Sequence, residues 1–164
     1  NVEMILEGYS ARVIREWYTH IGGAPTRLQA STRYVDYGEF KYIIPNSIKS
    51  NEDALRLYKK HMEGIKELCY QFIPREDVAL FLPLGMETRV VDKRNLRNLM
   101  EMSHQRLCTR AYWEYRELMR DICDALKNIS EEWKYIVENY FLPKCKIMGY
   151  CPEKQSCGLV NMNI

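Results

Sequence analysis

This sequence of 164 residues has neither a large excess of acidic or basic residues nor a long apolar run. Its 24 basic and 22 acidic residues leave a formal net charge of +2, so a basic nucleic-acid arm or a polyacidic tail is not expected. The longest apolar stretch, residues 78–86, contains Pro83 and is far shorter than the roughly 20 residues of a membrane span. We therefore expect neither nucleic acid nor a membrane among the partners of this protein.

A secretion signal is missing as well. The chain opens with Asn1 and continues directly into alternating polar and apolar residues, without the basic and apolar regions of a signal peptide. We expect a cytoplasmic protein, and we expect that a segment before Asn1 is absent from this chain.

Cysteine is too sparse for a disulfide scaffold, with six in 164 residues. Cys69, Cys108 and Cys123 fall within helical patterns, where thiols usually lie as small buried hydrophobic groups. No P-loop, Gly-x-Ser-x-Gly or His-Glu-x-x-His motif is present, and no cysteine has the surroundings of a nucleophile. The sequence therefore does not indicate nucleophilic catalysis by the protein itself.

A separate cysteine pattern lies near the end of the chain. Cys145, Cys151 and Cys157 form an evenly spaced C-x5-C-x5-C run. Tetrahedral zinc needs four ligands and usually uses closer pairs such as C-x2-C, whereas three thiolates can hold an iron–sulfur cluster with one open iron. A zinc ion or a cluster on this tail is one interpretation, and free thiols are the other, which the wide spacing favours.

The hydrophobic patterns predict a mostly helical α+β protein with one domain over residues 1–143 and a cysteine-containing tail over residues 144–164. Strands are expected at residues 2–6, within residues 32–44 and at residues 85–92, which would form a small antiparallel or mixed sheet. Helices are expected at residues 9–20, 50–72, 74–83, 94–105, 109–128 and 130–140.

The segment RLQASTRYVDY carries the clearest sign of a phosphate-binding site. Ser31 and Arg33 follow a Gly-rich loop and have the i, i+2 spacing that places two side chains on one side of an extended segment. A hydroxyl and a planar cation on one side suit a phosphate group. The alternative is a turn serine and a solvated arginine.

Three arginines gather in a second segment. Arg97, Arg106 and Arg110 lie within fourteen residues among aromatic side chains, and such a group could line an anion site. The alternative is a solvated helix face on which Arg97 pairs with Glu101, four residues later.

Four segments of this sequence, taken together, resemble the flavin-dependent thymidylate synthases. They are IREWYTH, QASTRYVDY, IPREDVALFLPLGMETRVV and NLRNLMEMSHQRLCTRAYWEYR. The resemblance covers residues 2–119, and its most specific parts are S-x-R-Y at residues 31–34 and N-x-R…R…W-E at residues 95–114. It implies methylation of deoxyuridine monophosphate (dUMP) to thymidine monophosphate, with methylenetetrahydrofolate and NADPH as co-substrates and FAD as cofactor. It also implies a homotetramer whose active sites draw residues from several subunits.

The resemblance implies roles for individual residues. Arg106 matches the arginine that lies over the uracil ring and promotes ionisation of N3, so we expect it to be catalytic. The expected nucleotide-binding residues are Glu16, Gln29, Ser31, Arg33 and Arg106. The expected flavin-binding residues are His20, Gln29, Asn95, Arg97, Glu101 and Arg110.

The sequence departs from the family pattern at positions that carry charge. Residues 19–21 read Thr-His-Ile where the family has Arg-His-Arg, and Ala79 replaces a third arginine. Each lost charge-assisted contact costs about 1.5–3 kcal/mol, and we expect Arg27 and Arg110 to restore part of the charge. A homologue acting on another pyrimidine nucleotide or with another redox group, and a noncatalytic assembly module, remain as alternatives.

Overall fold

The computed structural model describes residues 1–23, 25–32 and 34–160. The chain divides into two compact units. Unit 1 comprises Asn1–Val2, His20–Pro25 and Arg94–Ile164, and unit 2 comprises Glu3–Thr19 and Thr26–Lys93. Among the helices that the structure describes, none is long and apolar enough to cross a membrane.

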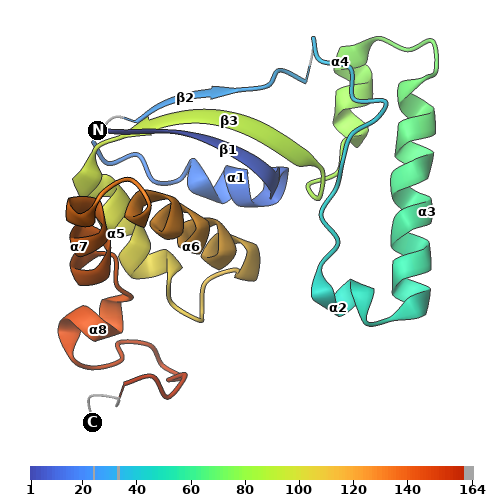
Figure 1. The fold of residues 1–164 in the computed structure, drawn as a ribbon. Helices are drawn as coiled ribbons and strands as arrows, with labels where there is room; N and C mark the ends of the chain where they lie inside the picture. Colours follow the sequence, from blue (N-terminus) through green and yellow to red (C-terminus); the bar gives the residue numbers. More distant parts are fainter. Residues whose placement is uncertain (24, 33, 161–164) are drawn as a thin grey trace. The chain divides into compact units, whose positions relative to one another are not determined.

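A three-stranded sheet is built from β1 (Val2–Ser10), β2 (Thr26–Gln29) and β3 (Glu87–Arg94). The strand order is β1-β3-β2, with β3 in the middle (Figure 1). β2 runs antiparallel to β3, with Thr26 opposite Lys93. Because β3 alternates buried and half-buried or exposed residues along its length, it has the pattern of a strand with one covered face.

Two ion pairs establish the direction of β1 against β3. The carboxylate of Glu3 lies 2.7 Å from the ammonium group of Lys93, and that of Glu7 lies 2.8 Å from the guanidinium of Arg89. From Glu3 to Glu7 the residue number on β1 rises by four, while that of the partner on β3 falls by four, from Lys93 to Arg89. These strands are therefore antiparallel.

The strand expected within residues 32–44 is wrong. This segment contributes one isolated bridge, between Tyr42 and Met86, and the third strand is β2 instead. A local turn competes with extended structure here, because a carboxylate oxygen of Asp36 accepts a hydrogen bond from the backbone N–H of Gly38 at 2.9 Å. Tyrosine and β-branched content therefore misled the assignment.

The helices of unit 2 begin with α1 (Ala11–Trp17), whose first turn is capped by the hydroxyl of Ser10 accepting from the N–H of Val13 at 3.3 Å. This hydrogen bond satisfies a helix N-terminal donor that would otherwise lack a partner. The remaining helices are α2 (Asn46–Lys49), α3 (Glu52–Cys69), α4 (Arg75–Val78) and the 3-10 helix η1 (Ala79–Phe81).

The core of unit 2 is a small apolar cluster. Phe40, Met62, Ile65 and Met86 are all buried in it. Met62 and Ile65 are three residues apart on α3, so they share one face of that helix. This one face supplies the contact that holds the long helix.

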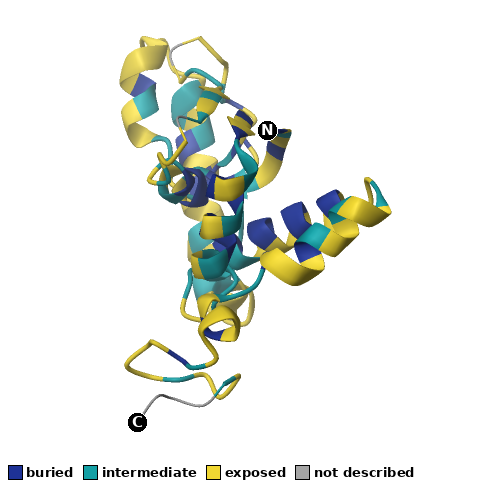
Figure 2. Ribbon diagram, turned by 90° about the vertical axis from the view of Figure 1, so that its left-hand side faces the viewer, coloured by how far each residue is buried: buried dark blue, intermediate teal, exposed yellow. Residues whose placement is uncertain are grey.

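Unit 1 contains α5 (Leu96–Arg106), α6 (Trp113–Lys127), α7 (Glu131–Tyr140) and α8 (Lys144–Met148). α6 packs against both α5 and α7, and α8 leads into the C-terminal tail (Figure 1). Ser130 caps α7 as expected, since its hydroxyl accepts from the N–H of Trp133 at 3.3 Å. The tail is mostly exposed apart from a short buried stretch (Figure 2). The predicted α+β class with a small antiparallel sheet is confirmed.

Candidate functional site

A buried arginine that sequence reasoning missed lies at the start of the site in unit 1. Arg94 is only 1% exposed. Its Nη1 donates to the backbone carbonyl of His20 at 2.8 Å, to Oδ1 of Asn98 at 2.8 Å and toward Sδ of Met102 at 3.1 Å. Arg94 therefore ties the backbone at His20 to the first two turns of α5.

His20 and Arg106 meet directly. Nε of Arg106 donates to Nε2 of His20 at 3.1 Å. The guanidinium carbon of Arg106 lies 4.4 Å from the ring centroid of Tyr115, and the His20 ring meets the same tyrosine at 6.2 Å and 73°. Because a guanidinium has no lone pair, Nε2 of His20 must be the acceptor. The imidazole is therefore neutral and carries its proton on Nδ1.

The surroundings of His20 favour this neutral form. Burial is the largest cause, and the positive charges of Arg106 and Arg94 add to it, so that the pKa of His20 falls from 6.5 to about 4. At neutral pH the histidine thus serves as a hydrogen-bond acceptor that holds Arg106 without adding charge.

Two glycines let the loop after His20 approach the start of α5. A Cβ on Gly22 would lie 2.9 Å from Nδ2 of Asn98, and a Cβ on Gly23 would lie 1.8 Å from Nδ2 of Asn95. Gly23 also has a φ of +73°, which other residues rarely adopt. Asn95 itself caps α5, because its side-chain oxygen accepts from the N–H of Asn98 at 2.7 Å.

Four of the six positions implied for flavin binding, Asn95, Arg97, Glu101 and Arg110, lie at the start of α5, along it or just beyond it. Arg97 is exposed and pairs with Glu101 at 3.0 Å, while Glu101 and Arg110 both line a cavity of about 530 Å³. The guanidinium groups of Arg97 and Arg110 suit a cofactor that carries a pyrophosphate, whereas the carboxylate of Glu101 suits hydrogen-bond donors of such a cofactor instead. Asn95 fits less directly, because its side chain already caps the helix.

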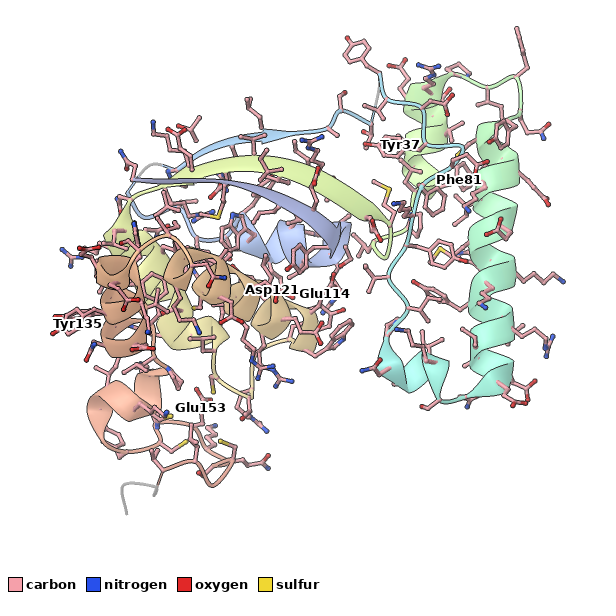
Figure 3. The ribbon with its side chains drawn as sticks, in the orientation of Figure 1. Tyr37, Phe81, Glu114, Asp121, Tyr135 and Glu153 are labelled. Atoms are coloured by element: carbon pink, nitrogen blue, oxygen red, sulfur yellow. The ribbon has the colours of Figure 1, made fainter. Side chains whose placement is uncertain are left out.

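The same cavity is lined by four cysteines, which are Cys108, Cys145, Cys151 and Cys157. Figure 3 shows sulfur atoms around Glu153, which also lines the cavity. The expectation that Cys108 lies within a helix is wrong, because α5 ends at Arg106 and Cys108 lies in the turn that follows. In the part of the chain that the structure describes, no three histidine, cysteine, aspartate or glutamate side chains are placed to hold one metal ion.

Unit 2 holds the other predicted nucleotide-binding residues. Glu16 lies on α1, and its carboxylate is 3.7 Å from the guanidinium of Arg12, one helical turn earlier. Gln29 ends β2 and its amide donates to the hydroxyl of Thr88 at 3.2 Å. Ser31 follows and is half-buried. Arg33 lies outside the described residues. Within unit 1 the structure brings His20 to Arg106, and Glu101 to Arg110.

Arg27 has a structural contact in unit 2. Its Nη1 donates to the backbone carbonyl of Tyr18 at 2.9 Å, and its guanidinium carbon lies 4.6 Å from the Tyr18 ring centroid. This arginine therefore joins the start of β2 to the end of α1. Its expected help with flavin charge stays a prediction, as does that of Arg110.

Solved structures share the fold. A structure of Thymidylate Synthase X (ThyX) from Helicobacter pylori with FAD and dUMP superimposes with a TM-score of 0.71 and 17% sequence identity, covering 85% of this chain and 72% of that one. A second structure of the same enzyme, also complexed with FAD and dUMP, gives a TM-score of 0.67 at 18% identity. This chain thus has the fold that is seen in thymidylate synthase X.

Sequence relatives give the family. The flavin-dependent thymidylate synthase of Pyrococcus abyssi is 35% identical over 136 residues, which are 77% of this chain and 55% of the relative. That of Clostridium tetani is 29% identical over 151 residues, covering 79% of this chain and 59% of the relative. The chain thus spans little more than half the length of these relatives. The sequence model of the thymidylate synthase complementing protein family matches residues 1–130, and the chain belongs to this family. The resemblance read from the sequence is confirmed.

Proposed function

We propose that the protein methylates dUMP to thymidine monophosphate, with methylenetetrahydrofolate as the one-carbon donor, FAD as cofactor and NADPH as reductant. Membership of the family supports this proposal. The observation that carries it is the contact between His20 and Arg106, because it holds in a defined orientation the arginine that the resemblance matches to the catalytic one of the family. The protein would act in the cytoplasm.

Arg106 is the catalytic residue in this proposal. Transfer of a one-carbon unit to C5 of uracil requires that carbon to become nucleophilic, and a guanidinium at the N3/O4 edge stabilises the anionic pyrimidine that is needed. The single proton on Nε is directed at His20, so the terminal nitrogens of Arg106 make the contact with the base. Tyr115 supports the flat face of the guanidinium.

The nucleotide is further held by Glu16, Gln29, Ser31 and Arg33. Ser31 and Arg33 bind its phosphate or sugar in this proposal, because the family resemblance assigns their segment to the nucleotide and because a hydroxyl and a guanidinium both suit a phosphate group. The half-buried position of Ser31, directly after β2, supports this role.

FAD supplies the hydride when bound. The residues that hold it in this proposal are His20, Gln29, Asn95, Arg97, Glu101 and Arg110. The exposure of Arg97 and the place of Glu101 and Arg110 at one cavity support the assignment. With Arg27 engaged at Tyr18, Arg110 is the better placed of the two arginines to offset the charge missing at Thr19 and Ile21.

A homotetramer completes the proposal. Unit 2 exposes several large apolar side chains, including Phe72, Leu80 and Phe81, of which Phe81 is labelled in Figure 3. Apolar groups gathered on a surface are typical of interaction sites, and four subunits form a common closed assembly. Sedimentation of the full-length protein at micromolar concentration is expected to give a tetramer.

The test of function is release of tritium from dUMP labelled at C5, measured on full-length protein. We expect turnover to fall by a factor of roughly 100 or more in Arg106→Ala. Arg120→Ala is the matched control, since this arginine lies on the exposed side of α6, and it should stay within about twofold of wild type. Equal turnover in Arg106→Ala and wild type would contradict the catalytic assignment, and absence of both flavin and tritium release in wild type would contradict the proposed function.

A further inference from the structure

Two basic side chains from separate segments, Arg110 and Lys144, line the cavity of about 530 Å³ in unit 1. Arg110 lies in the turn between α5 and α6, and Lys144 is the first residue of α8. We propose that these two residues bind the diphosphate group of FAD, so that the tail contributes a cofactor-binding residue, Lys144. This inference rests on the proposed function, because it takes FAD as the cofactor.

Both basic side chains are available to a ligand. Each is exposed, and among the described residues neither one forms a hydrogen bond or an ion pair. Two carboxylates line the same cavity, those of Glu101 and Glu153, but that of Glu101 is already paired with Arg97 at 3.0 Å. Two cations therefore face one remaining carboxylate, and the excess positive charge favours an anionic ligand.

The cavity continues the row of residues that are expected to bind the flavin. Arg97, Glu101 and His104 follow one another at spacings of four and three residues, so they share one side of α5. Glu101 and His104 line the cavity, and His104 lies about 10 Å beyond Arg97 along the helix axis. A dinucleotide bound at Arg97 can thus extend along α5, with its diphosphate between Arg110 and Lys144.

The turn that carries Arg110 is fixed by two contacts. The N–H of Ala111 donates to the carbonyl of Cys108 at 3.0 Å. The side chain of Thr109 hydrogen-bonds the thiol of Cys157 in the tail, which lowers the pKa of that thiol. The tail is therefore held against the residue that precedes Arg110, and both segments contribute to one cavity without a movement of the chain.

Lys144 is placed by buried neighbours in the sequence. Phe141 and Cys145 are only 3% and 7% exposed, so the backbone on both sides of Lys144 is anchored and less order must be gained on binding. Lys146 lies two residues later on α8, is also exposed, and falls outside the cavity lining. It is the matched control, because it has the same side chain on the same helix in different surroundings.

The first experiment compares flavins with and without phosphate. Equilibrium dialysis of the full-length protein measures its affinity for FAD, for riboflavin, which has no phosphate, and for ADP, which has the diphosphate without the flavin. Lys144→Gln should weaken FAD and ADP binding roughly tenfold and change riboflavin binding by less than about twofold. Lys146→Gln should bind all three like wild type. Unchanged FAD affinity in Lys144→Gln, or an equal loss for FAD and riboflavin, overturns the proposal.

Glu153 allows a test of opposite sign. Its side chain lies in the tail (Figure 3) and lines the cavity. Glu153→Gln removes a negative charge from beside the diphosphate, so FAD should bind about two to three times more tightly than to wild type. Equal or weaker binding of FAD to Glu153→Gln would show that this cavity does not take the diphosphate.

Tritium release from labelled dUMP separates this inference from the proposed function. If wild type releases tritium and Lys144→Gln binds FAD like wild type, the inference is wrong and the proposed function stands. If FAD and ADP binding depend on Lys144 as expected but wild type releases no tritium, the proposed function is wrong and the inference stands.

Discussion

Arg94 and Arg106 in unit 1 are held differently from Arg75, the arginine that contacts Tyr34 in unit 2. In unit 1, Arg94 is buried and makes three contacts shorter than 3.2 Å, and Arg106 is fixed by His20 and Tyr115. In unit 2, Arg75 is exposed, and it donates to the carbonyl of Tyr34 at 3.0 Å. The site in unit 1 is therefore organised without a ligand, whereas the segment beside Arg75 in unit 2 is held by exposed contacts, and we expect a bound ligand to order it further.

This difference predicts that substitutions in unit 1 act first on stability. The largest effect is expected for Arg94→Ala, which leaves the partly buried carbonyl of His20 and the buried side chain of Asn98 without this donor. Unfolding free energy should fall by about 3–5 kcal/mol, measured by urea unfolding followed by circular dichroism. Arg97→Ala is the control, since its side chain is 88% exposed, and it should cost at most about 0.5 kcal/mol. Equal losses in the two variants would contradict the comparison.

The next effect concerns the glycine loop over α5. Gly23→Ala must place a Cβ 1.8 Å from Nδ2 of Asn95 and also keep a positive φ. Gly8→Ala has nearly the same φ, +77°, but open space around the new Cβ. We expect about 1 kcal/mol of destabilisation for Gly8→Ala and roughly 2–3 kcal/mol for Gly23→Ala, because Asn95 loses its capping position. Indistinguishable urea midpoints would show that the loop does not press on Asn95.

A smaller effect depends on pH. The pKa of His20 is about 4 in the folded protein and about 6.5 when unfolded, so below pH 6.5 the unfolded chain binds a proton that the folded one does not. The unfolding free energy should therefore fall as pH drops from 7 to 4, by about 2 kcal/mol for this partly exposed group. His20→Gln keeps an acceptor for Arg106 but cannot titrate, and its stability should fall less over the same range.

The control for this pH effect is the same substitution at an exposed site. His61→Gln, on the exposed side of α3, should leave the pH dependence of the wild type in place. If His20→Gln and wild type lose equal stability between pH 7 and 4, the inference that His20 is neutral in the folded protein is wrong.

The sequence predicted features that depend on local pattern and missed those that depend on distant contacts. The helical period and the Ser130 cap placed α7 correctly, and β1 and β3 also follow from alternation. Arg94 gave no signal, because its importance comes from a carbonyl 74 residues away. The place of Cys108 likewise depends on a tail that packs back on the end of α5. The strand β2 was missed because it has only four residues, which lack a strong strand pattern.

The smallest expected effect concerns Arg75, the exposed arginine of unit 2. Arg75→Ala removes the donor to Tyr34 and the contact with Asp36, at 3.8 Å. Because these groups are solvated, unfolding free energy should change by less than about 1 kcal/mol. The segment should nevertheless become looser, so the N–H of Val35, which donates to the carbonyl of Ser31 at 3.2 Å, should exchange with deuterium faster than in wild type.

Arg56→Ala provides the matched control for that last prediction. Arg56 is exposed to a similar degree, but it lies on α3 and pairs there with Asp53 at 3.1 Å. Both variants should lose similarly little stability, and only Arg75→Ala should speed exchange at Val35 and weaken dUMP binding, by up to about threefold. Addition of dUMP should restore the slow exchange in Arg75→Ala, since the ligand orders the segment that the arginine held. Unchanged exchange in Arg75→Ala would mean that unit 2 holds this segment by other contacts, and the contrast between the units would then be smaller than we infer.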